Sequence, residues 1–246
     1  MKRLIGTAAL ALMIAGCGGS GDNSQSAAAS GNVALTNVPP PAGTQWTDVV
    51  EKTAEGGFRM GNPNAKVKLI EFGSRSCPHC AKFDEDSGAL RTKYVASGSV
   101  SYEFRDFMIH PQDPAAAVLG QCGGPQPFFA MLDQMFADQP NSFARLDKLP
   151  PDASAQIQGK SAPELVAWWA ENAGYLDFVK QRGISEEKAR SCLADQKGLE
   201  ALVAGNQRDT AQYNISGTPT FVVNGKTVDG VNDWAGLEPV LKGALQ

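Results

Sequence analysis

Cys77 and Cys80 are the residues of this sequence whose types and spacing most clearly allow chemistry. They lie between an apolar stretch, residues 67–72, and a segment, residues 81–95, that we expect to be helical. A helix N-terminus has unpaired N–H groups and partial positive charge, which stabilise a thiolate and lower the pKa of a cysteine placed there. The pattern therefore predicts a redox-active disulfide between the two cysteines, with Cys77 as the nucleophile.

The two residues between these cysteines favour the same chemistry. Pro78 suits the first turn of a helix, because the N–H group that it lacks would have no partner there. His79, when protonated, adds positive charge close to the Cys77 sulfur and favours its thiolate. We therefore include His79 among the candidate catalytic residues.

A Cys-x-x-Cys pair has two other common explanations. It could be half of a structural zinc site, but such a site needs a second pair of closely spaced ligands. The remaining cysteines and the second histidine are isolated in the sequence: Cys17, Cys122, Cys192 and His110. It could also be an inert disulfide, although so short a loop is strained and favours reduction. We therefore expect no metal and no cofactor, and we interpret His110 as a surface loop residue.

Glu71 is a charged residue inside the apolar stretch at residues 67–72, which we expect to be a strand covered on both faces. A carboxylate there is costly unless it has a partner or a task. One hypothesis is a buried proton acceptor beneath the disulfide, with its pKa raised by burial. The alternative is a residue at a strand end that reaches solvent or pairs with Arg75.

Length and composition are those of one large domain, or of a domain with an insertion. The net charge of −4 gives no reason to expect a nucleic acid partner. The first residues combine a basic start, Lys2 and Arg3, with an apolar stretch, residues 4–15, ahead of Cys17. This segment resembles a bacterial lipoprotein signal, which implies lipidation at Cys17. The alternative is an ordinary secretory signal, and either one exports the chain to a place where disulfides persist.

The secondary structure of the remaining chain is predicted from its hydrophobic periodicity and its turn residues. Residues 18–45 are rich in Gly, Ser, Ala and Pro and are expected to form a flexible linker. Strands are predicted at residues 67–72, 100–105 and 220–223, with a hairpin turn at Asn224-Gly225, and helices at residues 113–122, 128–136, 165–173 and 234–245 and after Ser185. Residues 140–160 are predicted to be rich in loops, and Trp168 and Trp169 to pack in the core of the helical region.

With these residues in place, the chain resembles a known family. Glu71, the Cys-Pro-His-Cys tetrapeptide at residues 77–80 and the Gly-Thr-Pro-Thr-Phe segment at residues 217–221 look like the thioredoxin superfamily. The tetrapeptide and the helical block between the strands look like its DsbA-type branch of exported thiol oxidases. The resemblance implies an α/β protein, a thioredoxin fold with an inserted helical domain. The expected parts are a lipoprotein signal at 1–17, a linker at 18–45, thioredoxin-like segments at 46–107 and 201–246, and a helical insertion at 108–200.

The resemblance also implies roles for single residues. Cys77 matches the exposed attacking cysteine, Cys80 its buried partner, and Glu71 the buried acid beneath them. Pro219 matches a cis-proline whose loop binds the substrate backbone together with Thr218. The oxidases often have valine where this chain has Thr218, and threonine occurs there in the related isomerases.

Cys122 and Cys192 are the two cysteines left over, and both lie in the helical block of a chain that we expect to be exported. We predict a structural disulfide between them. The alternative is two buried free thiols.

The function predicted from the sequence is the oxidation of dithiols in exported proteins by the Cys77–Cys80 disulfide. The resemblance implies a DsbB-like, quinone-linked membrane oxidase as the partner that restores this disulfide. We expect a monomer, anchored by a lipid to a membrane of the cell envelope and located in the periplasm. The alternatives are a disulfide isomerase or reductase of the same fold, and a metal-binding lipoprotein that delivers copper.

Overall fold

The structure, a computed structural model, describes residues 35–246. The lipoprotein signal at 1–17, the lipidated Cys17 and most of the linker at 18–45 lie outside the described residues, so these remain predictions. Within the described part, no helix has both the length and the apolar character needed to cross a membrane.

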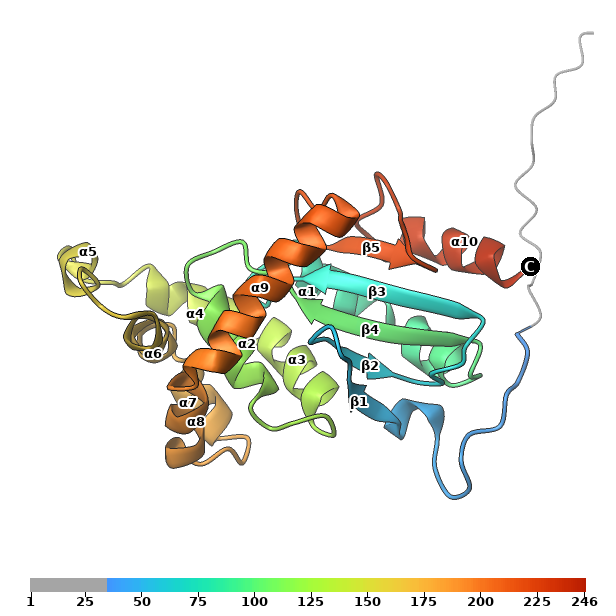
Figure 1. Ribbon diagram of the computed structural model, residues 1–246, viewed down its shortest axis with the longest axis horizontal. Coiled ribbons are helices and arrows are strands. Elements are labelled where there is room, and N and C mark those ends of the chain that lie inside the picture. The colour runs from blue at the N-terminus through green and yellow to red at the C-terminus, as the bar shows by residue number, and fades with distance from the viewer. Residues whose placement is uncertain (1–34) are drawn as a thin grey trace, which may run out of the picture. The chain divides into compact units, whose positions relative to one another are not determined.

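A mixed sheet of six strands forms the centre of the described chain (Figure 1). Its order is β1-β2-β4-β3-β5-β6, with β3 and β4 parallel in the middle and antiparallel neighbours on both sides. The strands are β1 Val50–Lys52, β2 Phe58–Met60, β3 Val67–Gly73, β4 Val100–Asp106, β5 Thr220–Val223 and β6 Lys226–Thr227. Parallel strands need a crossover connection, and here α1 and the π-helical turn after it provide one.

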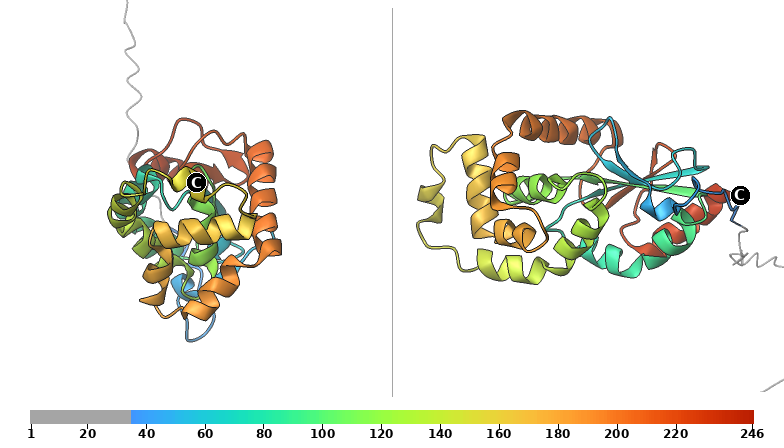
Figure 2. Two further views of the ribbon diagram at one scale, coloured as in Figure 1. Left: turned by 90° about the vertical axis from the view of Figure 1, so that its left-hand side faces the viewer. Right: turned by 90° about the horizontal axis from the view of Figure 1, so that it is seen from below.

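Helices cover both faces of the sheet and form a separate block between β4 and β5. They are α1 Pro78–Asp86, the π-helical turn Leu90–Val95, α2 Asp113–Gln121, α3 Phe128–Ala137, α4 Gln139–Leu146, α5 Ala153–Gln156, α6 Ala162–Asn172, α7 Tyr175–Lys180, α8 Glu186–Leu193, α9 Gln196–Tyr213 and α10 Trp234–Leu245, with a 3₁₀ turn at Trp46–Asp48. The sheet lies between α9 on one side and α1 and α10 on the other (Figure 2, right). This is the α/β arrangement with a helical insertion that the resemblance implied.

The structure adds four local features to what the sequence predicts. The helical segment expected before residue 95 starts at Pro78, as the placement of Pro78 in a first turn predicts, but it is interrupted at Ser87 before the π-helical turn. The loop-rich stretch at residues 140–160 also contains most of α4 and all of α5, which its sequence did not indicate. β2 follows directly on a Gly-Gly break and had no pattern long enough to predict it. α9 continues well past residue 200 and brings the chain back to the sheet.

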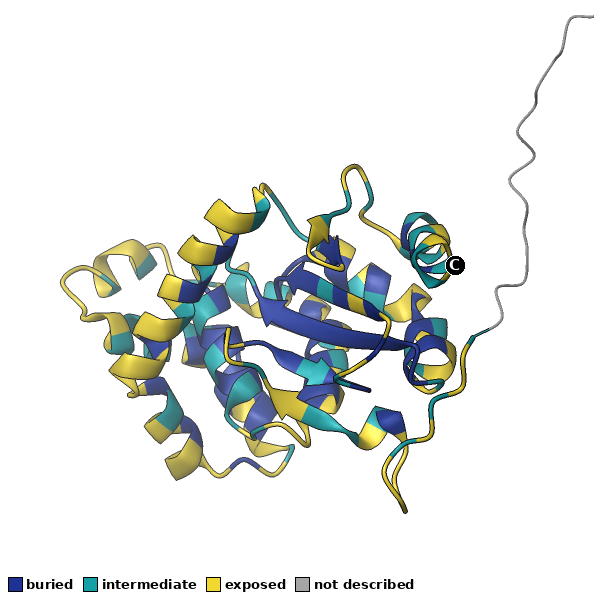
Figure 3. Ribbon diagram, turned by 45° about the vertical axis from the view of Figure 1, so that its right-hand side comes forward, coloured by how far each residue is buried: buried dark blue, intermediate teal, exposed yellow. Residues whose placement is uncertain are grey.

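β3 and β4 form the core of the sheet (Figure 3). One face of the two strands packs against aromatic and aliphatic side chains of α1, α3 and α10. On the other face β4 carries polar side chains, and all seven of its residues are nevertheless buried. Arg105 of that face pairs with Glu103 at 2.7 Å and with Asp209 of α9 at 3.3 Å, so the charges are compensated where α9 covers the sheet.

The helical block has its own apolar cluster, built mainly from α2, α6, α7 and α8. Its helix starts follow the sequence signals: Glu164 accepts a hydrogen bond from the Ser161 N–H at 2.8 Å, and the Ser185 hydroxyl accepts one from the Lys188 N–H at 3.2 Å. Trp168 and Trp169 are only half-buried, and the Trp168 indole donates to Gln156 on the outside of the block, so the expected core position is wrong for Trp168.

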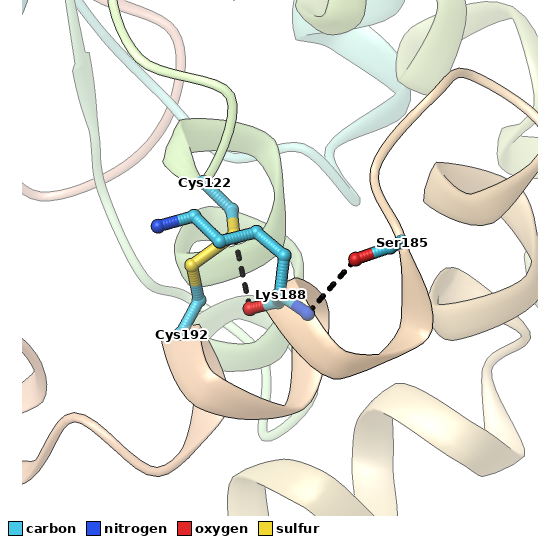
Figure 4. Close-up of a disulfide and its surroundings, with 4 residues drawn as sticks. All are labelled: Cys122, Ser185, Lys188 and Cys192. Atoms are coloured by element: carbon cyan, nitrogen blue, oxygen red, sulfur yellow. Dashed lines mark hydrogen bonds between the residues drawn. A yellow bond between two sulfur atoms is a disulfide. The ribbon is translucent and has the colours of Figure 1, made fainter.

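A disulfide joins α2 to α8 in this block (Figure 4). Cys122, which ends α2, is bonded to Cys192 of α8, across a separation of 70 residues in the sequence. The cross-link restricts the unfolded chain, which is the main way in which such a long loop stabilises a fold.

Candidate active site

The Cys-Pro-His-Cys tetrapeptide lies at the junction of β3 and α1, as its position in the sequence predicts. Cys77 is the N-cap of α1 and Pro78 its first residue, so the backbone N–H groups of His79 and Cys80 at the helix start act on the Cys77 sulfur. Both cysteines are thiols in this structure. Cys77 is only 3% exposed and Cys80 is fully covered, so the expectation of an exposed attacking cysteine is wrong for this state of the site.

The two thiols differ strongly in acidity. A hydrogen bond from Cys80, with further donors from Thr218 and from the backbone N–H groups of Cys80 and His79, lowers the pKa of Cys77 to about 5. Burial, and then the hydrogen bond to Cys77, raises the pKa of Cys80 well above its ordinary value. The pair therefore consists of one thiolate and one thiol at neutral pH. This is the arrangement of a nucleophilic cysteine with a resolving partner.

His79 lies at the surface, and its contribution to the low pKa of Cys77 comes from its backbone N–H group. The sequence had suggested that its imidazole would supply the charge. The side chain is exposed, and the influence of an exposed charge is weakened by solvent and salt.

Glu71 is buried, with 1% of its surface exposed, and its charge acts on both cysteines. Burial raises the pKa of its carboxyl to about 8, against the opposing effect of a hydrogen bond from the Tyr102 hydroxyl. The alternative of a solvent-exposed Glu71 paired with Arg75 is wrong, because Arg75 binds another acid. A carboxyl with this pKa can both give and take a proton near neutral pH, which suits general acid–base catalysis.

The loop before β5 covers the Cys77 sulfur. Its Thr218–Pro219 peptide bond is cis, as the resemblance implied. The Cys77 thiol donates to the Thr218 carbonyl oxygen at 3.3 Å. The Thr218 hydroxyl is buried and has no partner within residues 35–246, so it is available as a donor to Cys77 once the thiol ionises. The loop also borders an open hollow of about 320 Å³ next to the site, lined largely by residues 214–220 and 227–232.

Arg75 fixes the loop between β3 and Cys77, and the sequence alone did not identify this role. Its guanidinium is 1% exposed, makes two hydrogen bonds to the Asp106 carboxylate at 2.6 and 3.2 Å, and lies over the ring of Phe128. Gln139 of α4 donates to the carbonyl oxygens of both Arg75 and Cys77 at 3.0 Å. The helical block is thus attached to the backbone of the nucleophile itself.

Asp113 fixes the same loop from the start of α2. This buried carboxylate accepts hydrogen bonds from the hydroxyls of Ser74 at 2.9 Å and Ser76 at 2.5 Å, and from the backbone N–H of His110 at 2.9 Å. The Ser76 hydroxyl also contacts Nδ1 of His110 at 2.8 Å. His110 is exposed, as expected of a loop residue. Its ring nevertheless contacts Ser76, the residue that precedes Cys77.

The sequence profile of a family described as Thioredoxin matches residues 53–243. A crystal structure described as protein-disulfide isomerase from Novosphingobium aromaticivorans is similar with a TM-score of 0.72 and 30% identity, covering 76% of this chain and 96% of that one.

Two sequence relatives are more distant. A putative protein-disulfide oxidoreductase of Rickettsia bellii (strain RML369-C) is 27% identical over 178 residues, which are 72% of this chain and 60% of that protein. The chain thus matches less than two thirds of the length of this relative. Disulfide bond formation protein D of Bacillus subtilis (strain 168) is 23% identical over 209 residues, which are 82% of this chain and 84% of that protein.

Proposed function

Because the chain belongs to the thioredoxin family, we propose that it is a thiol–disulfide oxidoreductase that works through Cys77 and Cys80. The observation that carries this proposal is the placement of two thiols at one helix start, with Cys77 as the N-cap of α1 and the buried Cys80 in its first turn, and the opposite displacement of their pKa values supports it. A low pKa makes Cys77 a good leaving group, and a high pKa keeps Cys80 protonated and silent until the disulfide has to reform. The names of the relatives support the same reaction class.

The proposed reaction transfers two electrons from a substrate dithiol to the enzyme. A substrate thiolate attacks the Cys77 sulfur of the Cys77–Cys80 disulfide, which forms a mixed disulfide and releases Cys80. The second substrate thiolate attacks the substrate sulfur of that mixed disulfide. Cys77 then leaves as a thiolate, the substrate is oxidised to a disulfide and the enzyme is reduced to its dithiol.

Glu71 supplies the proton for the buried partner in this scheme. Cys80 leaves in a place where burial strongly disfavours a thiolate, so it needs a proton at that moment. With a pKa of about 8, Glu71 is mostly protonated at pH 7 and acts as the acid. In the reverse direction its carboxylate removes the proton from Cys80.

The favoured direction is oxidation of the substrate. At pH 7 a thiol with a pKa of about 5 is ionised almost completely. Relative to an ordinary thiol, this stabilises the reduced enzyme about 100-fold, or by about 60 mV in a two-electron couple. Stabilising the reduced enzyme makes its disulfide more oxidising.

Isomerisation is the second candidate, and Thr218 favours it. The resemblance associates threonine before the cis-proline with isomerases, and the structure from Novosphingobium aromaticivorans is described as a protein-disulfide isomerase.

The metal-binding alternative requires a cluster of ligands. Among residues 35–246, no three His, Cys, Asp or Glu side chains are placed to hold a metal ion.

The equilibrium redox potential of the Cys77–Cys80 pair tests the proposed function. We expect a value more positive than about −200 mV at pH 7, measured in glutathione buffers. Reduction takes up one proton, on Cys80, when Cys77 is ionised, and two protons when it is not. The potential is therefore expected to fall by about 59 mV per pH unit below pH 5 and by about 30 mV per unit above it.

The pH series separates the possible outcomes. A potential near that of reductants, about −270 mV, would favour a reductase or an isomerase kept reduced. A change of slope at pH 8 to 9 in place of about 5 would contradict the low pKa on which the oxidising direction rests.

The proposed setting is the cell envelope, where exported proteins are the substrates. The Cys122–Cys192 disulfide in the helical block supports an oxidising compartment. The proposal also includes a periplasmic location, a monomeric state and a lipid anchor at Cys17. It further includes a DsbB-like, quinone-linked membrane oxidase, which would restore the Cys77–Cys80 disulfide.

The lipid anchor is tested by metabolic labelling with a radioactive fatty acid. The natural chain is expected to incorporate the label into the cell envelope fraction, and Cys17→Ala to lose it. Equal labelling of both chains would contradict lipidation at Cys17, and labelling of neither would favour an ordinary secretory signal.

A further inference from the structure

Tyr102 is a buried residue next to the site that the reaction above does not use. It lies on β4, on the same face of the sheet as Glu71 of β3, because Leu69 pairs with Tyr102 and Glu71 pairs with Phe104. Tyr102 is 2% exposed, and its hydroxyl donates to Oε2 of Glu71 at 2.6 Å. A tyrosine has one proton to donate, so its hydroxyl is committed to this carboxyl.

The other oxygen of Glu71 has no such partner. Oε1 is buried and makes no hydrogen bond within the described residues. Oε1 lies beside Gly73, because a Cβ atom added to Gly73 would be 3.1 Å from it. Gly73 is the last residue of β3, and the chain continues from it to Cys77. A buried carboxyl oxygen without a partner is costly unless it has a task in the reaction.

From these contacts we infer that Tyr102 is a positioning residue: its hydroxyl holds Oε2 of Glu71, so that Oε1 carries the proton exchanged with Cys80. The inference rests on the proposed function and deepens it, because it assigns the two carboxyl oxygens to two different tasks. The proton moves from Oε1 to the departing Cys80 sulfur when the disulfide opens and returns when the disulfide closes. Tyr102 keeps its own proton throughout.

The surroundings hold the Tyr102 ring in the required orientation. The ring packs against Phe129 with centroids 5.4 Å apart, and the Arg91 guanidinium lies 6.0 Å from its centre. Arg91 is held in turn by Asp133 through two hydrogen bonds and by Asp84 at 3.0 Å. Burial raises the pKa of Tyr102 well above its ordinary value, so the hydroxyl is a donor at every pH of interest.

Other groups bear on the titration of Glu71: Cys77 from the N-cap of α1, Cys80 and Asp84 from α1 itself, Arg91 from the π-helical turn and Tyr102 from β4. Asp84 raises the pKa of Glu71 and Arg91 lowers it, so these two charges oppose each other. The hydrogen bond from Tyr102 is the largest influence that lowers this pKa, after burial has raised it. Removing the hydroxyl therefore has a predictable sign.

Tyr102→Phe tests the inference, because it removes the hydroxyl and keeps the ring. A lost hydrogen bond to a carboxylate is expected to raise the pKa of Glu71 by about one to two units. A weaker acid transfers its proton more slowly, so opening of the disulfide by dithiothreitol and its closure by oxidised glutathione are both expected to slow about three- to tenfold at pH 7. The redox potential is expected to stay unchanged, because the rates in both directions fall by the same factor.

The pH profile provides the readout that a merely structural role would not move. After division by the thiolate concentration of dithiothreitol, the opening rate of the natural chain is expected to fall above a pH near 8. In Tyr102→Phe this fall is expected about one to two units higher. Tyr94→Phe is the matched control, because the Tyr94 hydroxyl is equally committed to a carboxylate, that of Glu238, at 2.8 Å. It is expected to leave the profile unchanged.

Glu71→Gln keeps the inference testable if Tyr102→Phe does not fold. This variant is expected to lose the fall near pH 8 altogether, and an unaltered profile would overturn the inference by assigning that fall to another group. If Tyr102→Phe folds, the double variant Tyr102→Phe with Glu71→Gln is expected to have the same pH profile of the opening rate as Glu71→Gln alone. An unmoved profile in Tyr102→Phe, or a potential that changes together with its rates, would also overturn the inference. Absence of any exchange in the natural chain would instead contradict the proposed function.

Discussion

Cys77→Ser is expected to reduce thiol–disulfide exchange to the uncatalysed rate, whereas Cys80→Ser is expected to accumulate mixed disulfides between Cys77 and substrate proteins. The difference follows from the two environments. The Cys77 thiolate, with a pKa of about 5, is the nucleophile and the leaving group, and a serine hydroxyl at the same place does not ionise near neutral pH. In Cys80→Ser the nucleophile is kept, but no second thiol remains to release a captured substrate.

Non-reducing gel electrophoresis of cell extracts measures this result directly. High-mass species that contain the chain should appear with Cys80→Ser, disappear on reduction, and be absent with Cys77→Ser and with the double variant. The matched control is Cys122→Ser combined with Cys192→Ser, which removes the disulfide of the helical block and leaves the tetrapeptide intact. If Cys77→Ser retained the exchange activity, the assignment of the nucleophile would be wrong.

The buried position of Cys77 affects which substrate proteins Cys80→Ser is expected to trap. The sulfur is covered by the Thr218–Pro219 loop and is 3% exposed, so a substrate has to enter alongside that loop. The open hollow at residues 214–220 and 227–232 adjoins this entry. We therefore expect unfolded chains with accessible cysteines to be trapped in preference to folded proteins, because an extended segment fits alongside a loop more easily.

The sequence predicts the parts of the site that depend on local patterns. The strand before Cys77, the helix that begins at Pro78 and the hairpin at Asn224-Gly225 all follow from turn residues, capping and periodicity over short windows. The sequence also singles out Glu71 as a carboxylate inside an apolar strand, but it leaves open whether the side chain is buried or reaches solvent, and the structure buries it.

The parts that the sequence does not predict depend on the register between distant strands. Arg75 has Glu71 as its nearest acid in the sequence, but β3 and β4 align Gly73 with Asp106, and this brings Asp106 to the guanidinium. Tyr102 lies opposite Leu69 for the same reason and thereby reaches Glu71. In the sequence, Tyr102 is one aromatic residue in an alternating strand, and nothing there separates it from a core residue.

Arg75→Met is expected to lower the free energy of unfolding by about 3–5 kcal/mol, the cost of leaving one member of a buried ion pair without its partner. Among the residues that the structure describes, the Asp106 carboxylate, 3% exposed, would keep only the amide of Gln121 at 2.9 Å as a side-chain donor. Methionine retains apolar bulk against Phe128, so the loss reports mainly on the charge. At about 2–4 °C per kcal/mol for a domain of this size, the melting temperature should fall by about 6–20 °C.

Two further variants separate the buried pair from an ordinary surface charge. Lys82→Met removes an ion-pairing cation that is 62% exposed, and it is expected to leave the unfolding midpoint nearly unchanged, because solvent screens such a pair. Arg75→Met combined with Asp106→Leu removes both charges and is expected to regain most of the lost stability, because the unpaired buried carboxylate is gone. Denaturant unfolding of all three variants measures these differences. A single variant within 1 kcal/mol of the natural chain, or a double variant no more stable than the single one, would show that the ion pair is not what holds this loop.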